Sequence, residues 1–226
     1  MTRTWLAIAL EVGFFALAFG WRSWLQWRRT GSTGFIRPRL DAPAAERAGA
    51  IGFVLALVLL VAAPVADLVG LERLGPLEPG WVAVLGGLLA GAGIVLTLVA
   101  QMAMGDSWRI GVDEGERTEL VTNGVFARVR NPIFSAMLLA SAGLVLLVPN
   151  VVSVAALLVL VVALQVQVRL VEEPYLESVH GDAYRTYRAR SGRFLPARAR
   201  RSTDEILAME GSGFPFTNDE LERRTP

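Results

Sequence analysis

The chain has 226 residues, of which 53% are hydrophobic, and its mean hydropathy is positive, which argues against an ordinary soluble domain. It contains no cysteine, so disulfides, thiolate metal sites and cysteine nucleophiles are excluded. With a formal net charge of +1 and one histidine, the chain is expected to bind neither nucleic acid nor a metal ion.

Five apolar runs dominate the chain, at residues 5–21, 50–69, 81–104, 134–148 and 151–168. A run of about 18 or more apolar residues can cross a hydrocarbon core roughly 30 Å thick. The runs show no alternation of apolar and polar residues and are too long for strands, so helices are predicted. We therefore predict an all-α, polytopic membrane protein with about five transmembrane helices.

The first run carries a carboxylate, Glu11, near its middle. Burying a charged carboxylate in a bilayer costs several kcal/mol, so such a residue is a candidate functional group. The alternative is that Glu11 is protonated or meets a polar group on a neighbouring helix.

The later runs carry packing and turn signals. In the third run, Gly87 and Gly91 form a small-xxx-small pair that lets helices approach closely. The fourth run has about 15 residues, and Pro149-Asn150 separates it from the fifth. The last two runs are therefore predicted to form a tight C-terminal helical hairpin.

Arginine carries all of the positive side-chain charge, because the chain has no lysine. Six arginines lie in residues 22–49, four in 105–132 and ten from residue 169 onward, against one in 70–80. Arginine-rich segments stay on the cytoplasmic side, so we expect the N-terminus outside and the C-terminus inside. The composition suggests a bacterial source, which makes the bacterial plasma membrane the expected location.

A first polar block, residues 104–134, separates the third and fourth runs and contains Arg130-Asn131-Pro132. Pro132 disfavours helical geometry at Asn131, so a helix should begin here with Pro132 in its first turn. Free backbone N–H groups and the Arg130 guanidinium would then suit a carboxylate or phosphate. The alternative is an arginine cluster that anchors the protein to anionic headgroups.

A second polar block, residues 169–196, follows the fifth run. Arg169, Glu172 and Glu173 have helical i, i+3 and i+4 spacing and should share a face. The two carboxylates suit an ammonium, a ribose diol or an arginine; alternatively, they form a solvated helix end. His180 and Gly181 mark a surface turn, and the tyrosines and arginines after them suit an interfacial helix on the headgroups.

The two blocks together resemble a family of membrane methyltransferases. The first reads Leu120-Val121-Thr122-x-Gly124-Val125-Phe126-x-x-x-Arg130-Asn131-Pro132-x-Phe134; the second reads Glu172-Glu173-x-x-Leu176, then Gly181-Asp182-x-Tyr184-x-x-Tyr187 and Pro196. These patterns are similar to the motif blocks of the isoprenylcysteine carboxyl methyltransferases and their bacterial and phospholipid-methylating relatives. They occur in the family's order, with a helical hairpin between them.

The resemblance implies S-adenosylmethionine as methyl donor, bound by cytoplasmic segments, and a lipid-like acceptor that reaches the site from the membrane lipids. It implies a cofactor site lined by Leu120, Val121, Phe126, Arg130, Asn131, Pro132, Phe134 and Glu172, with Glu173 and Arg169 as candidate catalytic residues. The chain departs from the family pattern at three positions. Asn131 stands where histidine is common, and Phe126 and Phe134 replace tyrosines.

Methyl transfer from a sulfonium is an in-line displacement, so the protein must align donor and acceptor and exclude water. A carboxylate acceptor is ionised at about pH 7 and needs no base. An amine acceptor must lose a proton, and Glu173 is the nearest candidate base. Both O- and N-methylation stay open.

Three regions are expected: N-terminal transmembrane helices and loops (1–103), a methyltransferase core (104–196) and a cytoplasmic tail (197–226). Two other functions remain open. One is a nicotinamide-dependent membrane reductase of the sterol-reductase type, which has a similar C-terminal block. The other is a non-catalytic lipid-binding membrane protein, which the changes at Asn131, Phe126 and Phe134 keep open. The intact Leu-Val-Thr-x-Gly pattern favours methyl transfer.

Overall fold

The computed structural model describes residues 1–36, 42–111 and 119–197. The chain divides into two units, Met1–Pro196 and Ala197–Pro226. The described residues form helices and two isolated β-bridges, with no strand among them. The predicted all-α architecture is therefore confirmed, whereas the predicted tail lies outside the described residues apart from Ala197.

The helices follow the apolar runs. The first is continuous and consists of α1 (Thr2–Phe14), the π-helical segment η1 (Phe15–Trp21) and α2 (Arg22–Thr30). Then come α3 (Ala44–Leu68), α4 (Gly80–Ala103), α5 (Pro132–Leu147) and α6 (Val151–Gln167), which continues through the π-helical η5 (Val168–Glu172) into α7 (Glu173–Arg190). Short 3-10 turns are η2 (Gly75–Leu77), η3 (Gly105–Ser107) and η4 (Gly124–Ala127).

Length and composition allow several of these helices to cross a membrane. Within the described ranges, four helices are long and apolar enough: Thr2–Thr30, Ala44–Leu68, Gly80–Ala103 and Val151–Arg190. The α5 helix is apolar but shorter, with 16 residues. The chain is thus a multi-pass helical membrane protein, as predicted.

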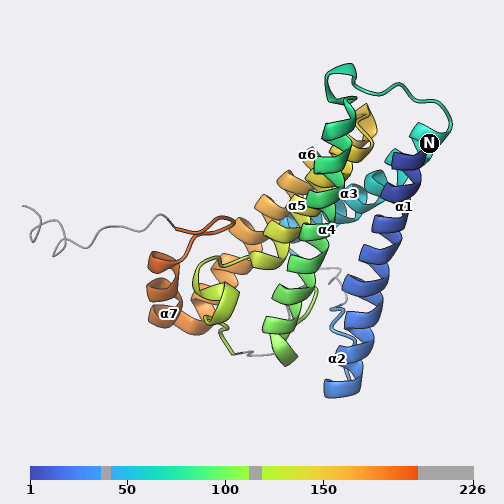
Figure 1. Ribbon diagram of the computed structural model, residues 1–226. Helices are drawn as coiled ribbons and strands as arrows, with labels where there is room; N and C mark the ends of the chain where they lie inside the picture. Colours follow the sequence, from blue (N-terminus) through green and yellow to red (C-terminus); the bar gives the residue numbers. More distant parts are fainter. Residues whose placement is uncertain (37–41, 112–118, 198–226) are drawn as a thin grey trace, which may run out of the picture. The chain divides into compact units, whose positions relative to one another are not determined.

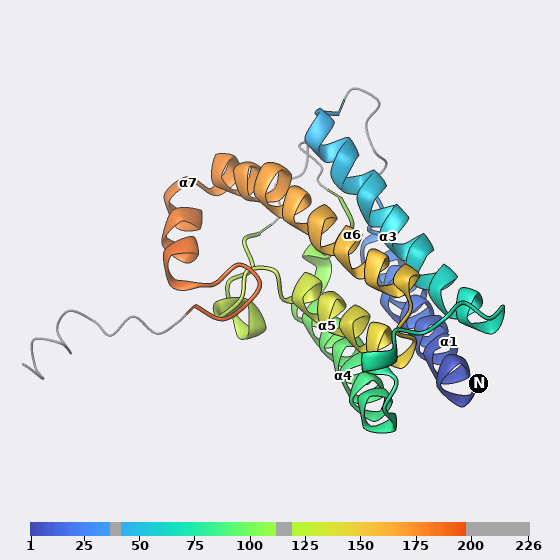
Figure 2. The same ribbon diagram turned by 90° about the horizontal axis from the view of Figure 1, so that it is seen from above.

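The bundle is built from two helix pairs, because α4 packs along α5 and α3 packs along α6 (Figure 2). The α4–α5 contact is close because small residues lie on its inner face. A Cβ atom on Gly86 would lie 2.8 Å from the carbonyl oxygen of Gly143. The predicted pair is not at this close contact: a Cβ on Gly91 would meet nothing within 4 Å, and one on Gly87 would come only within 4.0 Å of Leu147 Cδ2 in α5. Gly86 and Gly93 lie two turns apart on the face of α4 that packs against α5, whereas Gly91 lies on another face.

The predicted hairpin is present, since α5 ends at Leu147 and α6 begins at Val151. Asn150 and Ser153 form a capping box: the Ser153 N–H donates to Asn150 Oδ1 at 2.9 Å, and the Asn150 N–H donates to Ser153 Oγ at 3.2 Å. The Asn150 amide also donates to the Ala63 carbonyl at 2.9 Å. This buried side chain therefore fixes the turn and attaches it to α3.

Polar contacts fasten the end of the bundle that carries the hairpin turn. Thr4 Oγ1 donates to Asp67 Oδ2 at 2.6 Å, and Arg73 Nε binds Asp67 Oδ1 at 2.6 Å. The Leu74 N–H donates to the Pro149 carbonyl at 2.6 Å. The start of α1, the loop after α3 and the hairpin turn thus lie together. The described parts of both polar blocks lie toward the other end (Figure 1).

Candidate active site

A cavity of about 620 Å³ lies between the two polar blocks and the helices, within the usual range for small-molecule sites. The structure brings most of the predicted site residues to its wall: Leu120, Val121, Phe126, Arg130, Asn131, Pro132, Phe134, Glu172 and Glu173. Arg169 is not part of this wall. The two polar blocks, which residues 135–168 separate in the sequence, therefore face one cavity.

The start of α5 positions the end of the first polar block. Asn131 is the N-cap and Pro132 occupies the first turn, as predicted. The Asn131 side-chain amide donates to the Arg193 carbonyl at 3.2 Å, and its backbone N–H donates to the same oxygen at 3.1 Å. Ser135 Oγ donates to the Phe194 carbonyl at 2.6 Å. This helix start thus holds the segment that follows α7.

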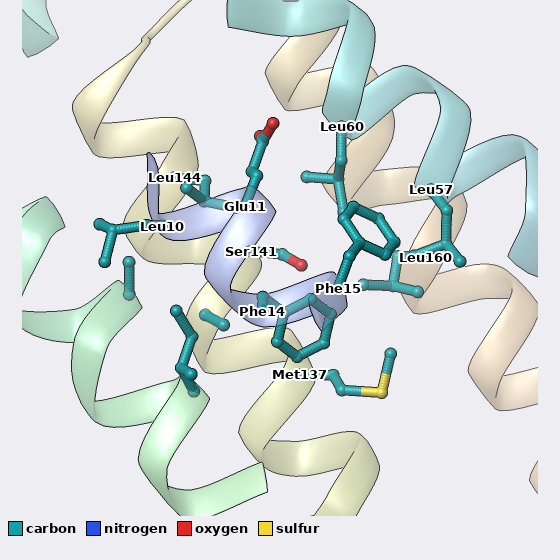
Figure 3. Close-up of a pocket in the computed structure, with 13 residues that line it drawn as sticks. Leu10, Glu11, Phe14, Phe15, Leu57, Leu60, Met137, Ser141, Leu144 and Leu160 are labelled. Carbon is teal, nitrogen blue, oxygen red and sulfur yellow. The ribbon is translucent and has the colours of Figure 1, made fainter. Parts of the chain in front are cut away.

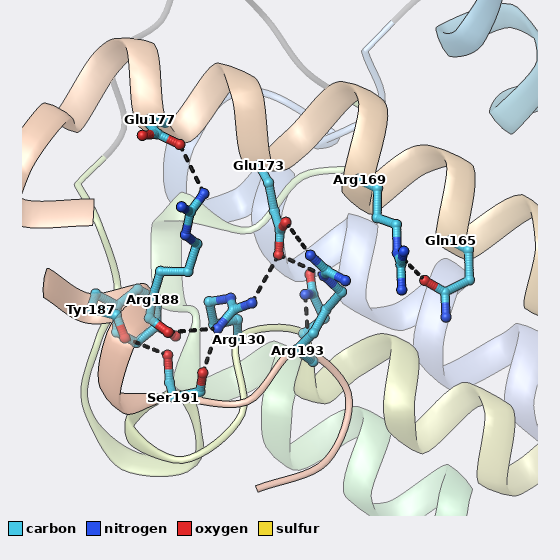
Figure 4. Close-up of polar contacts among 10 residues, drawn as sticks. Arg130, Gln165, Arg169, Glu173, Glu177, Tyr187, Arg188, Ser191 and Arg193 are labelled. Atoms are coloured by element: carbon cyan, nitrogen blue, oxygen red, sulfur yellow. Dashed lines mark hydrogen bonds and ion pairs between the residues drawn. The ribbon is translucent and has the colours of Figure 1, made fainter. Parts of the chain in front are cut away.

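Arg130 connects three segments (Figure 4). Its Nη2 donates to Glu173 Oε1 at 3.0 Å, and its Nη1 donates to the carbonyls of Arg188 and Ser191. Its side chain is 9% exposed. Both Nη groups of the guanidinium predicted to meet a ligand carboxylate or phosphate are therefore engaged with the protein itself, whereas its buried Nε has no hydrogen-bond partner among the described residues.

Glu173 has a second arginine partner that the sequence analysis missed. Arg193 Nε donates to Glu173 Oε1 at 2.8 Å and Arg193 Nη2 donates to Oε2 at 2.7 Å, a bidentate pair (Figure 4). These hydrogen bonds raise the pKa of the Arg193 guanidinium above its ordinary value. Two guanidinium groups stabilise the ionised Glu173 carboxylate, which makes it a weak proton acceptor.

Glu172 and Arg169 have different environments, although both lie in the π-helical η5 segment. Glu172 lines the cavity, where its Oε1 accepts from Gln167 Nε2 at 3.4 Å. Arg169 is exposed and donates to Gln165 Oε1 at 2.9 Å (Figure 4). The segment is not a regular α-helix, so the predicted α-helical i, i+3, i+4 geometry does not apply to it. Such π-helical turns are frequent at functional sites.

Tyr184 and Tyr187 were predicted to lie on the headgroups, but both are buried and line the cavity. Tyr187 Oη donates to the Phe126 carbonyl at 2.8 Å. The reason is Gly181, whose φ of 52° breaks the helical geometry and turns the chain back (Figure 2). The turn brings the second half of α7 against the first polar block.

The α2 helix closes the same region from the N-terminal side. Arg22 is 1% exposed, its Nη2 donates to the Gly105 carbonyl at 2.6 Å, and its guanidinium carbon lies 4.5 Å from the Trp108 ring centroid. This is cation–π geometry. Trp108 is itself buried and lines the cavity. The contact between Arg22 and Trp108 could not be predicted from the sequence, because the two residues lie far apart in the chain and share no motif.

Membrane-crossing helices form the rest of the wall. The π-helical η1 contributes Phe15, Ala18 and Phe19, while α3 contributes Phe53 and α5 contributes Met137. The bundle thus adds mainly aromatic and aliphatic side chains to the wall, with a few polar ones such as Arg47 and Gln101, while the polar blocks supply both charged and apolar side chains. Such a site suits a ligand pair of which one member is polar and the other apolar.

The fold and the site define the class of the protein: it is a helical membrane protein with a cavity between its polar segments and its helix bundle. Residues 81–183, from the start of α4 into α7, match the family model described as phospholipid methyltransferase. This match bears out the resemblance to membrane methyltransferases seen in the two polar blocks. A comparison with curated proteins found no match to the chain.

Proposed function

We propose that the protein is an S-adenosylmethionine-dependent methyltransferase that acts on a lipophilic acceptor at the cytoplasmic face of a bacterial plasma membrane. The observation that carries the proposal is the cavity of about 620 Å³, whose wall passes from the polar blocks to the membrane-crossing helices. A donor with a charged amino-acid group and an acceptor with an apolar tail fit the two parts of that wall. The family match over residues 81–183 supports the reaction class.

The wall residues suit the proposed donor. Glu172 offers a carboxylate to the ammonium group or a ribose hydroxyl of the donor. Trp108 and Phe126 offer aromatic surface to its adenine ring. Leu120 and Val121 complete the apolar part of this wall. When bound there, S-adenosylmethionine supplies an activated methyl group on sulfur.

The remaining residues position the reactants. The Arg130–Glu173–Arg193 cluster holds the segment that follows α7 against the start of α7 and the segment just before α5. Glu173 is committed to two arginines, so Glu172, which lines the same cavity, is the better-placed base for an N–H acceptor. Arg169 has no place in this arrangement, because it pairs with Gln165 outside the cavity.

The non-catalytic alternative has one specific observation in its favour. Arg130 and Asn131, two central motif residues, direct their side-chain hydrogen bonds to the protein's own C-terminal segment. A protein that kept this fold only to bind a lipid would show the same contacts. The family match, by contrast, favours methyl transfer over the nicotinamide-dependent reductase.

Calorimetric titration of detergent-purified protein with S-adenosylhomocysteine, and separately with NADPH, tests the proposal. We expect S-adenosylhomocysteine to bind with a Kd on the order of micromolar. Val121→Trp fills the cavity and should abolish binding, whereas Arg169→Ala, outside the wall, should retain it. Arg130 and Glu173 variants are unsuitable here, because their loss would disturb the fold.

Three results would decide between the functions. Folded wild-type protein that binds neither ligand contradicts the proposal, and NADPH binding alone supports the reductase. Binding of S-adenosylhomocysteine without transfer of labelled methyl groups to a bacterial lipid extract supports the non-catalytic protein. Binding together with transfer establishes the methyltransferase.

A further inference from the structure

Gln101, in the last turn of α4, has a side chain whose orientation the structure defines. It is 3% exposed, lines the cavity and donates from Nε2 to the Ala18 carbonyl at 3.0 Å. A carbonyl oxygen accepts hydrogen bonds and cannot donate them, so the amide nitrogen must face Ala18. The amide oxygen, Oε1, therefore faces away from η1.

The Gln101 Oε1 atom is buried and has no hydrogen-bond partner among the described residues. A buried polar atom left in this state costs about 1–3 kcal/mol, and native structures satisfy most such atoms. The Nε2 bond to Ala18 keeps the oxygen from turning to another partner. An unpaired acceptor atom is thus buried in a residue of the cavity wall, and a ligand can donate a hydrogen bond to it once the neighbouring side chains move slightly.

Thr97 lies one turn earlier on the same face of α4 and also lines the cavity. It is fully buried, and its Oγ1 donates its proton to the Gly93 carbonyl at 2.8 Å. The hydroxyl oxygen can then only accept from a ligand. Both polar groups on this stretch of α4 are therefore acceptors.

The surroundings of this pair are apolar. The neighbouring wall consists of Phe14, Ala18 and Phe19 from the first helix and Met137 from α5. Donor side chains elsewhere in the wall, such as Arg47 in α3 and Arg109 in the first polar block, are not part of this apolar stretch. A ligand that lies against α4 therefore needs an apolar body and a single group that carries N–H or O–H.

We propose that Gln101 positions the methyl acceptor by accepting a hydrogen bond from its N–H or O–H group, with Thr97 as a second acceptor. This inference rests on the proposed function. An amine or alcohol lipid satisfies the Gln101 oxygen, whereas an ionised carboxylate would place acceptor against acceptor. In the transfer, the acceptor nitrogen or oxygen would bond to the methyl carbon while the methyl–sulfur bond breaks with its electron pair on sulfur. An amine would lose an N–H proton other than the one bonded to Gln101 to Glu172 or solvent, whereas an alcohol would pass its only proton from the Gln101 contact to Glu172 or solvent.

Binding of three lipids with one common tail tests the inference: hexadecylamine, hexadecanol and hexadecanoic acid. Each is titrated into detergent-purified protein saturated with S-adenosylhomocysteine, and tryptophan fluorescence is recorded, because Trp108 lines the cavity. We expect the amine or the alcohol to bind at least about 10-fold more tightly than the acid. Gln101→Met, which keeps the volume but removes the oxygen, should abolish this preference, and Thr97→Val should reduce it.

Gln165→Met is the matched control, since Gln165 binds Arg169 outside the cavity wall, and it should leave the preference intact. S-adenosylhomocysteine affinity should stay within about twofold in Gln101→Met. Weaker S-adenosylhomocysteine binding in this variant would show that the oxygen serves the donor and would overturn the inference. Equal binding of the three lipids, or a preference for the acid, overturns it as well. If wild-type protein does not bind S-adenosylhomocysteine, the proposed function itself has failed.

Discussion

Glu173 and Glu11 are two carboxylates buried to the same degree, with 7% and 6% of their surface exposed, in opposite chemical surroundings. Glu173 opens α7 and accepts hydrogen bonds from Arg130 and Arg193. Glu11 lies in α1 and lines a cavity of about 20 Å³ whose other walls are largely leucine and phenylalanine side chains (Figure 3). It forms no hydrogen bond or ion pair with the residues that the structure describes.

The comparison shows that contacts within the fold explain why Glu173 is buried, but not why Glu11 is buried. Removing Glu173 would leave two guanidinium groups without their anion, so the two ion pairs explain why this carboxylate is buried. The Glu11 carboxyl satisfies nothing around it, and its cavity has room for about one water molecule. Glu173 should therefore contribute to stability, whereas Glu11 should reduce it.

Glu173→Ala tests the first half of the comparison and should have the largest effect. It leaves the Arg130 guanidinium, 9% exposed, without a counterion and detaches Arg193. Losing one partner of a buried ion pair typically costs about 3–5 kcal/mol. Thermal unfolding in detergent should show the loss, and hydrogen exchange should increase at residues 188–194.

Glu177→Ala is the matched control in the same helix. Glu177 accepts from Arg188 at 2.9 Å, but its side chain is 33% exposed. Its removal should cost less than about 1 kcal/mol, as for other ion pairs near the surface. Equal effects of the two substitutions would contradict the structural role given to Glu173.

Arg193→Ala should have an intermediate effect. It removes the bidentate pair, but Glu173 keeps its contact with Arg130, and the Arg193 side chain is 29% exposed. We expect a loss of about 2 kcal/mol. Arg185→Ala is the control. It removes an exposed ion pair with Asp182 in α7 and should leave the unfolding midpoint unchanged. A loss as large as that of Glu173→Ala would show that Arg130 does not hold Glu173 by itself.

Several features could be predicted from sequence because the signal is local. The apolar runs gave the helices, Pro149-Asn150 gave the hairpin, and Pro132 gave the start of α5. The motif residues could be assigned to one wall because they recur in two blocks with a family pattern. Each of these signals depends on neighbouring residues or on motif order.

Other features depend on contacts that no local signal specifies. Arg193 reaches Glu173 because Gly181 turns the chain back, and the glycine alone does not indicate the direction of that turn. The α4 helix is apolar on all sides, so the pattern did not distinguish the face of Gly86 from that of Gly91. Gln101 meets Ala18 across 83 residues, which only the packing of α4 against η1 determines.

Glu11→Leu tests the second half of the comparison and should have the smallest effect, with the opposite sign. Leucine has a similar volume and matches the apolar wall around residue 11, so the unfolding free energy should rise by about 1 kcal/mol. Glu11→Gln keeps a polar group without a partner and should give no such gain. Thermal unfolding of both variants in one detergent separates the effect of polarity from that of volume. A loss of stability in Glu11→Leu together with retention in Glu11→Gln would mean that the carboxyl meets a polar ligand or water in the membrane, and Glu11 would then resemble Glu173 rather than contrast with it.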